Sequence, residues 1–230
     1  MSENDARSVE GRRPVQSVRA QLLATEHWSL LASRSTAQGE VLTRISIFLT
    51  LVSAGLVSLA LIGQATRFSD RFVISAIVVL GFIWLVGVLT EVRVNAVAME
   101  DLMYVLAMNR LRAAYTELDA GIAPYLMSSV HDDMAGSRVT YDFLGIRRPF
   151  AHVAGSSMIF MSAVNAAILG LLVAGIASVL AAPVPLILVI GIALGVAYLV
   201  AASVYGARRY FRMWRTYRPY NPSRSWSPSR

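Results

Sequence analysis

Four long apolar runs constrain the fold of this chain more than any other feature of its sequence. The runs lie near Ile45–Ala65, Phe72–Leu89, Ser157–Ala182 and Val184–Val204, and none has Asp, Glu or Arg in its interior. About 20 apolar residues in a helix cross a hydrocarbon core of roughly 30 Å, and each charge inside it would cost about 2.5–3.5 kcal/mol. The 56% hydrophobic content also exceeds that of ordinary soluble domains. The sequence therefore predicts an all-α membrane protein with four transmembrane helices, arranged as two hairpins.

The arginines orient these spans. The chain has 21 Arg and no Lys, and only Arg67 and Arg71 lie in the short loops within the two hairpins. The other arginines lie in the N-terminal region, in the central segment and in the tail. Positive charge accumulates on the cytoplasmic side of spans. We therefore expect a multi-pass protein with both termini cytoplasmic, and the absence of Lys suggests the cytoplasmic (inner) membrane of a bacterium.

Two cytoplasmic helices are expected to continue the first two spans. The expected segments are a disordered N-terminus (1–14), a helix (15–44), the first span (45–65), the second span (72–90), a second helix (91–122), a loop with a juxtamembrane segment (123–152), the third span (155–182), the fourth span (184–204) and a basic tail (205–230). In both helices apolar residues recur every three or four positions, as on one helix face. We predict that they pack as an antiparallel cytoplasmic stalk, on which Glu91 and its neighbouring acids are solvated. The alternative is that each helix lies flat on the membrane.

Small residues within the last two spans predict close helix packing. They lie four positions apart on each span and comprise Ala166, Gly170, Ala174, Ser178, Gly191 and Gly195. Such spacing lets backbones approach closely, either within the chain or at a seam between copies. Asn165 is the most notable polar residue of the spans, because a buried amide needs a partner. A hydrogen bond between helices is one interpretation of Asn165, and a pore-lining role is the other.

Basic residues at the cytoplasmic ends of the spans are expected to bind lipid headgroups. The set comprises Arg44, Arg93, Arg147, Arg148, Arg208, Arg209 and Arg212. Because no acid follows Asp142, the tail should be attracted to anionic lipid. Tyr198 is interpreted as one of several interfacial aromatics. Nothing in the sequence resembles a nucleic-acid-binding fold, so a nucleic-acid partner is not expected.

No catalytic signature is present. The chain lacks cysteine, which excludes disulfides and thiol chemistry. The adjacent residues His131, Asp132 and Asp133 are interpreted as a loop with capping acids rather than a metal site, since adjacent residues rarely converge on one ion. No carboxylate or histidine is expected at membrane depth, which argues against a proton-coupled transporter. We expect no cofactor, no metal and no enzymatic activity.

Three stretches carry a resemblance to known proteins: LLATEHWSLLASRS (Leu22–Ser35), MNRLRAAY (Met108–Tyr115) and HDDMAG (His131–Gly136). On these the chain resembles an uncharacterised family of small bacterial four-span membrane proteins, which implies the four-span layout and no activity. In layout alone, residues 15–122 resemble two-span modules beside bacterial nucleotide-signalling defence systems, which are proposed to disrupt membranes. The hypotheses for function are a scaffold or sensor whose stalk binds a cytoplasmic protein, an oligomeric channel or pore-forming effector, and a small-solute transporter.

Overall fold

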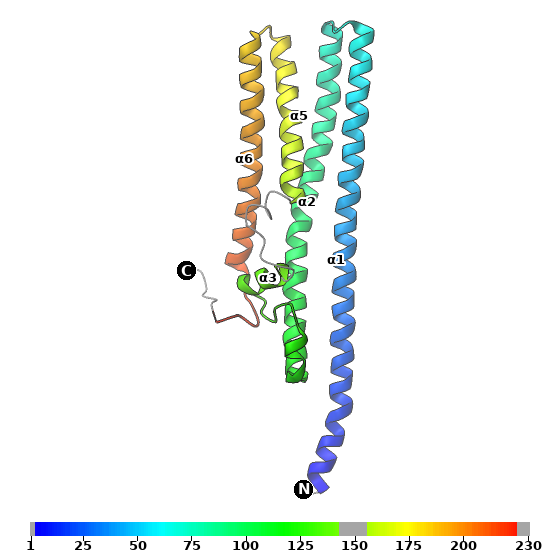
Figure 1. Ribbon diagram of the computed structural model, residues 1–230, viewed down its shortest axis with the longest axis vertical. Coiled ribbons are helices and arrows are strands. Elements are labelled where there is room, and N and C mark those ends of the chain that lie inside the picture. Colours follow the sequence, from blue (N-terminus) through cyan, green and yellow to red (C-terminus); the bar gives the residue numbers. More distant parts are fainter. Residues whose placement is uncertain (1–2, 143–155, 225–230) are drawn as a thin grey trace. The chain divides into compact units, whose positions relative to one another are not determined.

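The structure is a computed structural model that describes residues 3–142 and 156–224, with the side chains of the first helix described from Gln16 onward. Its elements are α1 (Glu3–Thr66), α2 (Asp70–Leu118), the 3₁₀ helix η1 (Ala120–Tyr125), α3 (Met134–Tyr141), α5 (Ser157–Val179) and α6 (Val184–Thr216) (Figure 1). The described residues contain no β-strand. Four of the helices, α1, α2, α5 and α6, are long and apolar enough to cross a membrane. The predicted all-α class and the four apolar helices are therefore confirmed.

Helix α1 begins at Glu3, whereas the sequence favours a disordered segment up to Pro14. Helix α2 ends at Leu118, short of the expected residue 122, and α5 ends at Val179, short of residue 182. Helix α6 continues past the fourth apolar run to Thr216, so the basic tail starts as a helix. The expected juxtamembrane segment with Arg147 and Arg148 lies outside the described residues, as does the end of the tail from residue 225.

The chain divides into two compact units. We call Met1–Gln38, Met99–Arg147 and Met213–Arg230 the polar unit, and Gly39–Ala98 with Arg148–Arg212 the apolar unit. Helices α1, α2 and α6 each contribute residues to both units, because none of them breaks where its apolar run ends.

In the apolar unit, glycines let neighbouring helices approach. Phe48 of α1 and Ile83 of α2 are almost fully buried. A Cβ added at Gly87 would lie 2.9 Å from the Phe48 ring, and one at Gly55 would lie 2.4 Å from Ile83. Since neither position tolerates a side chain without movement, both glycines are part of the contact between α1 and α2.

Tight turns join the paired helices of the apolar unit. Between α1 and α2, Arg67 and Phe68 take left-handed φ angles of 51° and 55°, and the Phe68 amide donates to Gly63 O at 2.9 Å. This bond closes the end of α1 as in a Schellman motif. Ala181 has a φ of 54° between α5 and α6, just before Pro183. Each non-glycine residue with a left-handed φ costs about 1 kcal/mol or more. The connections of three and four residues between these long helices are short enough to require it.

In the polar unit, α1 and α2 pair side by side in opposite directions. Arg19 of α1 lies 2.9 Å from Glu117 near the end of α2, and Arg34 lies 2.6 Å from Asp101. The carboxylate of Asp101 also accepts hydrogen bonds from Gln38 at 2.8 Å and from Tyr141 at 2.7 Å. Asp101 thus joins α1, α2 and the end of α3. The apolar stripe of α2 is buried beneath these contacts, at Leu102, Val105, Leu106 and Met108.

Candidate functional site

A carboxylate is buried among three helices of the apolar unit. Glu91 of α2 is only 5% exposed, and neutral side chains donate to both of its oxygens. Ser162 of α5 donates to Oε1 at 2.5 Å, while Asn165 of α5 and Tyr198 of α6 donate to Oε2 at 2.6 Å and 2.7 Å. We call these four residues the Glu91 cluster. It joins α2, α5 and α6 through one charged group.

The local sequence explains how the Glu91 cluster forms. Ser162 and Asn165 are three residues apart, so both side chains lie on the same face of α5. Gly87 lies one turn before Glu91, and a Cβ there would lie 2.0 Å from Asn165 Oδ1. Only glycine at position 87 leaves room for the amide. That Oδ1 atom is itself buried and has no hydrogen-bond partner among the described residues.

The position of Glu91 corrects the sequence-based interpretation. Glu91 was expected to be solvated at the start of the stalk, because it follows the last residue of an apolar run. In the structure α6 lies beside it, and the hydroxyl of Tyr198, expected to be an interfacial aromatic, donates to Glu91. Contact of this carboxylate with three of the apolar helices was not expected from the sequence. The polar residues Ser162, Asn165 and Tyr198 were the available signal, since isolated polar groups in apolar helices need a partner.

The small residues of α5 and α6 meet within the chain. A Cβ added at Gly170 would lie 2.9 Å from Gly191 O, and one at Gly191 would lie 2.8 Å from Gly170 O. A Cβ added at Gly195 would lie 2.8 Å from Ala166 O. Ala174 lies 3.5 Å from the same added atom at Gly191, whereas Ser178 is exposed and donates to Gly175 O of its own helix. The backbones of α5 and α6 are therefore in direct contact over most of the predicted small-residue pattern.

The arginines expected at lipid headgroups fall into different environments. Arg44 and Arg93 both pair with Glu40, at 2.9 Å and 2.8 Å. Hydrogen bonds from Arg93 and Arg44 stabilise the ionised form of Glu40 more than burial destabilises it. They therefore hold the pKa of Glu40 below its usual value. Arg208 and Arg212 of α6 are exposed and Arg209 is half-buried.

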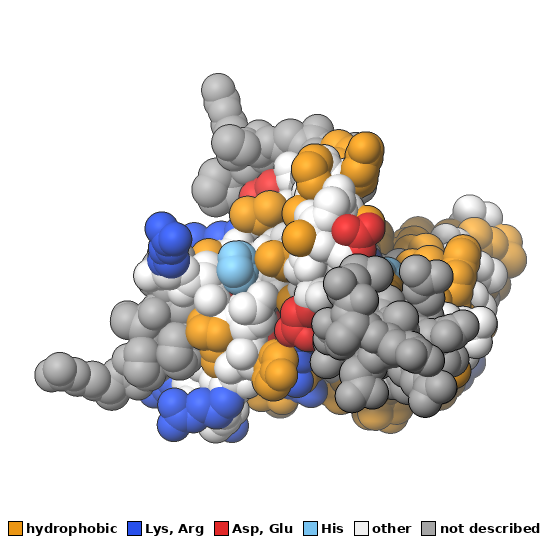
Figure 2. Space-filling model, turned by 90° about the horizontal axis from the view of Figure 1, so that it is seen from below, with side chains coloured by type: hydrophobic (Ala, Val, Ile, Leu, Met, Phe, Trp, Pro, Cys, Tyr) orange, Lys and Arg blue, Asp and Glu red, His pale blue; other side chains and the backbone are white. Residues whose placement is uncertain are grey.

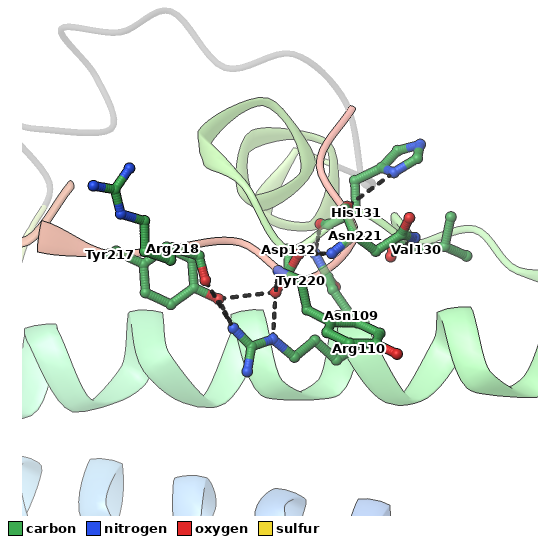
Figure 3. Close-up of polar contacts among 9 residues, drawn as sticks. All are labelled: Asn109, Arg110, Val130, His131, Asp132, Tyr217, Arg218, Tyr220 and Asn221. Atoms are coloured by element: carbon green, nitrogen blue, oxygen red, sulfur yellow. Dashed lines mark hydrogen bonds and ion pairs between the residues drawn. The ribbon is translucent and has the colours of Figure 1, made fainter. Parts of the chain in front are cut away.

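The polar unit contains a second buried carboxylate cluster, at the loop before α3. Asp132 is fully buried and accepts hydrogen bonds from the segment that follows α6 (Figure 3). The donors are the backbone amides of Tyr220 at 2.9 Å and Asn221 at 2.8 Å, the hydroxyl of Tyr217 at 3.0 Å, and Nε of Arg110. Arg110 also donates to Tyr217 and to the carbonyl of Arg218. We call this the Asp132 cluster.

Asp133 completes the attachment of the tail. It caps α3 by accepting from Gly136 N at 2.7 Å, and it accepts from Ser223 through the amide at 2.6 Å and the hydroxyl at 2.5 Å. A Cβ at Gly136 would lie 2.0 Å from the carbonyl oxygen of His131, so this turn requires glycine. The loop itself is fixed by Asn109, which donates to the same carbonyl at 2.8 Å.

Hydrogen bonding keeps both aspartates of this loop ionised. Burial opposes their charge, but Arg110 and the amides of Tyr220 and Asn221 lower the pKa of Asp132 below its usual value. Ser223 and the amide of Gly136 do the same for the pKa of Asp133. Burial and the charge of Asp132 raise the pKa of Tyr217 to about 12. The aspartates expected to cap a loop therefore also act as acceptors for residues about 90 positions later in the chain.

No protein-family model, curated protein sequence or solved structure matches this chain. The features of the chain that bear on its function are these two clusters and the exposed surface of the polar unit.

Proposed function

We propose that this chain is a non-enzymatic membrane scaffold or sensor whose polar unit binds a protein partner in the cytoplasm. The observation that carries the proposal is a set of apolar side chains exposed on α1 before its apolar run. Trp28 is 71% exposed, Leu22 67% and Val18 54%. Viewed from the end that carries η1, hydrophobic side chains lie at the surface among acidic and basic ones (Figure 2). Lipid covers exposed apolar residues in a span, but a helix outside the membrane needs another partner.

The ion pairs between α1 and α2 support a stalk rather than two helices lying flat on the membrane. Arg19 with Glu117, and Arg34 with Asp101, use charges that membrane-surface helices would direct to lipid and water. Such helices also carry richly basic polar faces, whereas α2 after Glu91 has as many acids as arginines: Glu100, Asp101 and Glu117 against Arg93, Arg110 and Arg112. On this proposal the polar unit lies on the cytoplasmic side of a bacterial inner membrane.

Cysteine labelling tests the orientation directly, because the chain has no native cysteine. Ser69→Cys in the first hairpin turn and Tyr125→Cys in η1 are both exposed positions. An impermeant maleimide added to intact cells should label Ser69→Cys and leave Tyr125→Cys unlabelled until the cells are lysed. The reverse pattern would overturn the orientation.

A photo-crosslinking amino acid at position 28 tests partner binding. In cells it should give a discrete adduct with another protein, because Trp side chains are enriched at the centres of interfaces. Glu26 is the matched control, since it is exposed on the other side of the same helix. Equal adducts at both positions, or none at position 28, would contradict a specific site at Trp28. An adduct with a second copy of the chain would instead favour an oligomer.

Two other functions remain as alternatives. The oligomeric channel or pore requires several copies, because four closely packed spans leave no lumen. A detergent-solubilised protein with the mass of one chain would refute it. The small-solute transporter is favoured by one observation, the buried Glu91, because carboxylates among spans mark ion and substrate pathways. Transport would appear as flux of a tracer solute into proteoliposomes that contain the wild type, and this flux should be absent with Glu91→Gln.

The basic residues around the end of α6 are proposed to bind anionic lipid. Arg208, Arg209 and Arg212 follow the fourth apolar run and precede the segment attached to Asp132 and Asp133. Each arginine near a surface of anionic lipid contributes about 1 kcal/mol. Replacing all three with Gln should weaken the binding of the tail to the lipid surface when the protein is in anionic nanodiscs. In neutral nanodiscs the variant and the wild type should not differ.

A further inference from the structure

Glu91 is a buried carboxylate that has no countercharge in the part of the chain that the structure describes. Within the described residues no arginine or histidine pairs with its carboxylate, and its three side-chain donors, Ser162, Asn165 and Tyr198, are neutral. Glu40, by comparison, lies on α1 of the same unit and is paired with two arginines. Hydrogen bonds satisfy the oxygens of a buried carboxylate, but they do not cancel its net charge in a low-dielectric surrounding.

The cluster lies within the length of the spans. At 1.5 Å per residue, Glu91 is about 30 Å along α2 from Asp70, Asn165 about 12 Å along α5 from Ser157, and Tyr198 about 21 Å along α6 from Val184. A Glu side chain also leans toward the start of its own helix, which for Glu91 is toward the interior of the span. The carboxylate is therefore near one end of the hydrocarbon region, not in bulk solvent.

Asn165 supplies the second, independent feature. Its side chain is fully buried, and its Oδ1 is an acceptor with no donor in the described part of the chain. The amide nitrogen faces Glu91 at 2.6 Å. Rotating the amide by 180° would turn Oδ1 toward the carboxylate, where it could face a bound cation or accept the proton of a neutral carboxyl group. The cluster would then offer oxygen atoms from Glu91, Ser162, Asn165 and Tyr198 around a single negative charge.

We propose that the Glu91 cluster is a binding site for a monovalent cation, either Na⁺ or a proton. One carboxylate with neutral oxygen donors suits an ion of charge +1, because a divalent ion would leave the buried site with net positive charge. Tyr198 on α6 is the titratable side chain in contact with Glu91. Arg93, two residues further along α2, pairs with Glu40 of α1, which also pairs with Arg44; α5 contributes only neutral groups. Occupancy neutralises Glu91 and couples α2, α5 and α6 to the ion. This inference does not depend on the proposed partner of the polar unit.

Carbodiimide labelling of the wild-type protein tests the site. Dicyclohexylcarbodiimide modifies protonated carboxyl groups in apolar surroundings, and mass spectrometry identifies the modified residue. In detergent, with choline as the only other monovalent cation, we expect labelling at Glu91 and not at Glu40. If the ligand is a proton, labelling falls as the pH is raised, because the reagent modifies only the protonated carboxyl group. If the ligand is Na⁺, adding NaCl at constant pH and ionic strength protects Glu91, and KCl protects it less.

A conservative variant separates ion binding from a purely structural role. Glu91→Gln has nearly the same volume as the native side chain but is permanently neutral, so it should remain folded. It should lose the Na⁺- or pH-dependent shift in Tm that belongs to Glu91, while the pH dependence contributed by His27 persists. Glu40→Gln is the matched control and should keep the wild-type response. The proposal is overturned if Glu91 resists the reagent at all pH values, or if its labelling depends on neither pH nor Na⁺. It is equally overturned if Glu91→Gln keeps the wild-type dependence of Tm on the ion.

Discussion

Replacing Asp132 with Asn should release the segment that follows α6 from the polar unit. The carboxylate accepts from Arg110, Tyr217 and Tyr220 on one oxygen and from Asn221 on the other. An Asn side chain has nearly the same volume, but only one of its two polar atoms accepts hydrogen bonds. If its oxygen keeps the three donors on the first side, its NH₂ group faces the amide N–H of Asn221. The variant therefore loses one acceptor and the charge, with almost no change in packing.

The magnitude follows from those contacts. A hydrogen bond to a charged group contributes about 1.5–3 kcal/mol, and its loss leaves a buried donor unsatisfied. The ion pair with Arg110 adds little, about 1 kcal/mol at most, because the Arg110 side chain is 42% exposed and water can replace its partner. The free energy that holds the segment should fall by about 3 kcal/mol. Since about 1.4 kcal/mol is a factor of ten, local opening should become roughly a hundredfold more frequent.

Hydrogen–deuterium exchange measures how often these hydrogen bonds open, because the amides of Tyr220 and Asn221 are themselves the donors to Asp132. In the wild type, a peptide covering residues 217–224 should exchange slowly, and Asp132→Asn should accelerate its exchange by roughly two orders of magnitude. Asp119→Asn is the control, since Asp119 is an exposed cap that accepts from Gly121 N at 2.8 Å. An acceleration in Asp132→Asn of less than about threefold, or an equal one in the control, would refute the reasoning.

Further outcomes follow from the same structure. Gly191→Ala should destabilise the protein by about 1–3 kcal/mol, because its Cβ would lie 2.8 Å from Gly170 O; Gly39→Ala should stabilise it by about 0.5–1 kcal/mol, because nothing lies within 4 Å of that position in α1. Thermal unfolding in detergent measures both, and shifts of the same sign would contradict the packing of α5 on α6. Burial and the nearby charge of Arg112 lower the pKa of His27, so the unfolded chain binds the proton more readily. His27 should contribute stability above about pH 6.5 that is lost as the pH falls through that value toward its lower folded pKa. His27→Gln should flatten that part of the pH profile of Tm, and an unchanged profile would refute the assignment. Tyr217→Phe should accelerate exchange at residues 217–224 less than Asp132→Asn does, because the ring remains under Arg110, 5.6 Å from its guanidinium carbon.

The parts of the fold that the sequence predicts are those set by local pattern. A run of apolar residues with no charge fixes the helix and its length, because the backbone must satisfy its own hydrogen bonds in lipid. Gly170 and Gly191 likewise predict a close approach of helices, because small residues at that spacing let the backbones of two spans come into contact. In each case the information lies within one segment, or within two segments joined by a short turn.

The two carboxylate clusters could not be predicted in this way, because their members are far apart in the sequence. Glu91 meets side chains that lie 71 to 107 positions later, and Asp132 meets amides nearly 90 positions later. A carboxylate at the end of an apolar run is normally solvated, so burial of Glu91 runs against the local pattern. The tail carries arginine without acid, which predicts lipid binding, but its attachment to the polar unit uses backbone amides and hydroxyls that no charge pattern reveals.

Three acidic groups in this chain show how environment separates residues of the same type. Glu40 remains partly exposed and pairs with two arginines, Arg44 on its own helix and Arg93 on α2. Its charge is therefore balanced, and the pair with Arg93 holds α1 to α2. Asp132 is fully buried, but one arginine and two backbone amides offset the charge that it fixes. Glu91 is also buried, yet its donors are all neutral. If a hydrogen-bonded anchor were all that the apolar unit required, glutamine at position 91 would connect the same helices without burying a charge. A bound cation would neutralise the charge that remains on Glu91. Ion binding and the packing of α2, α5 and α6 are therefore expected to depend on each other at this position.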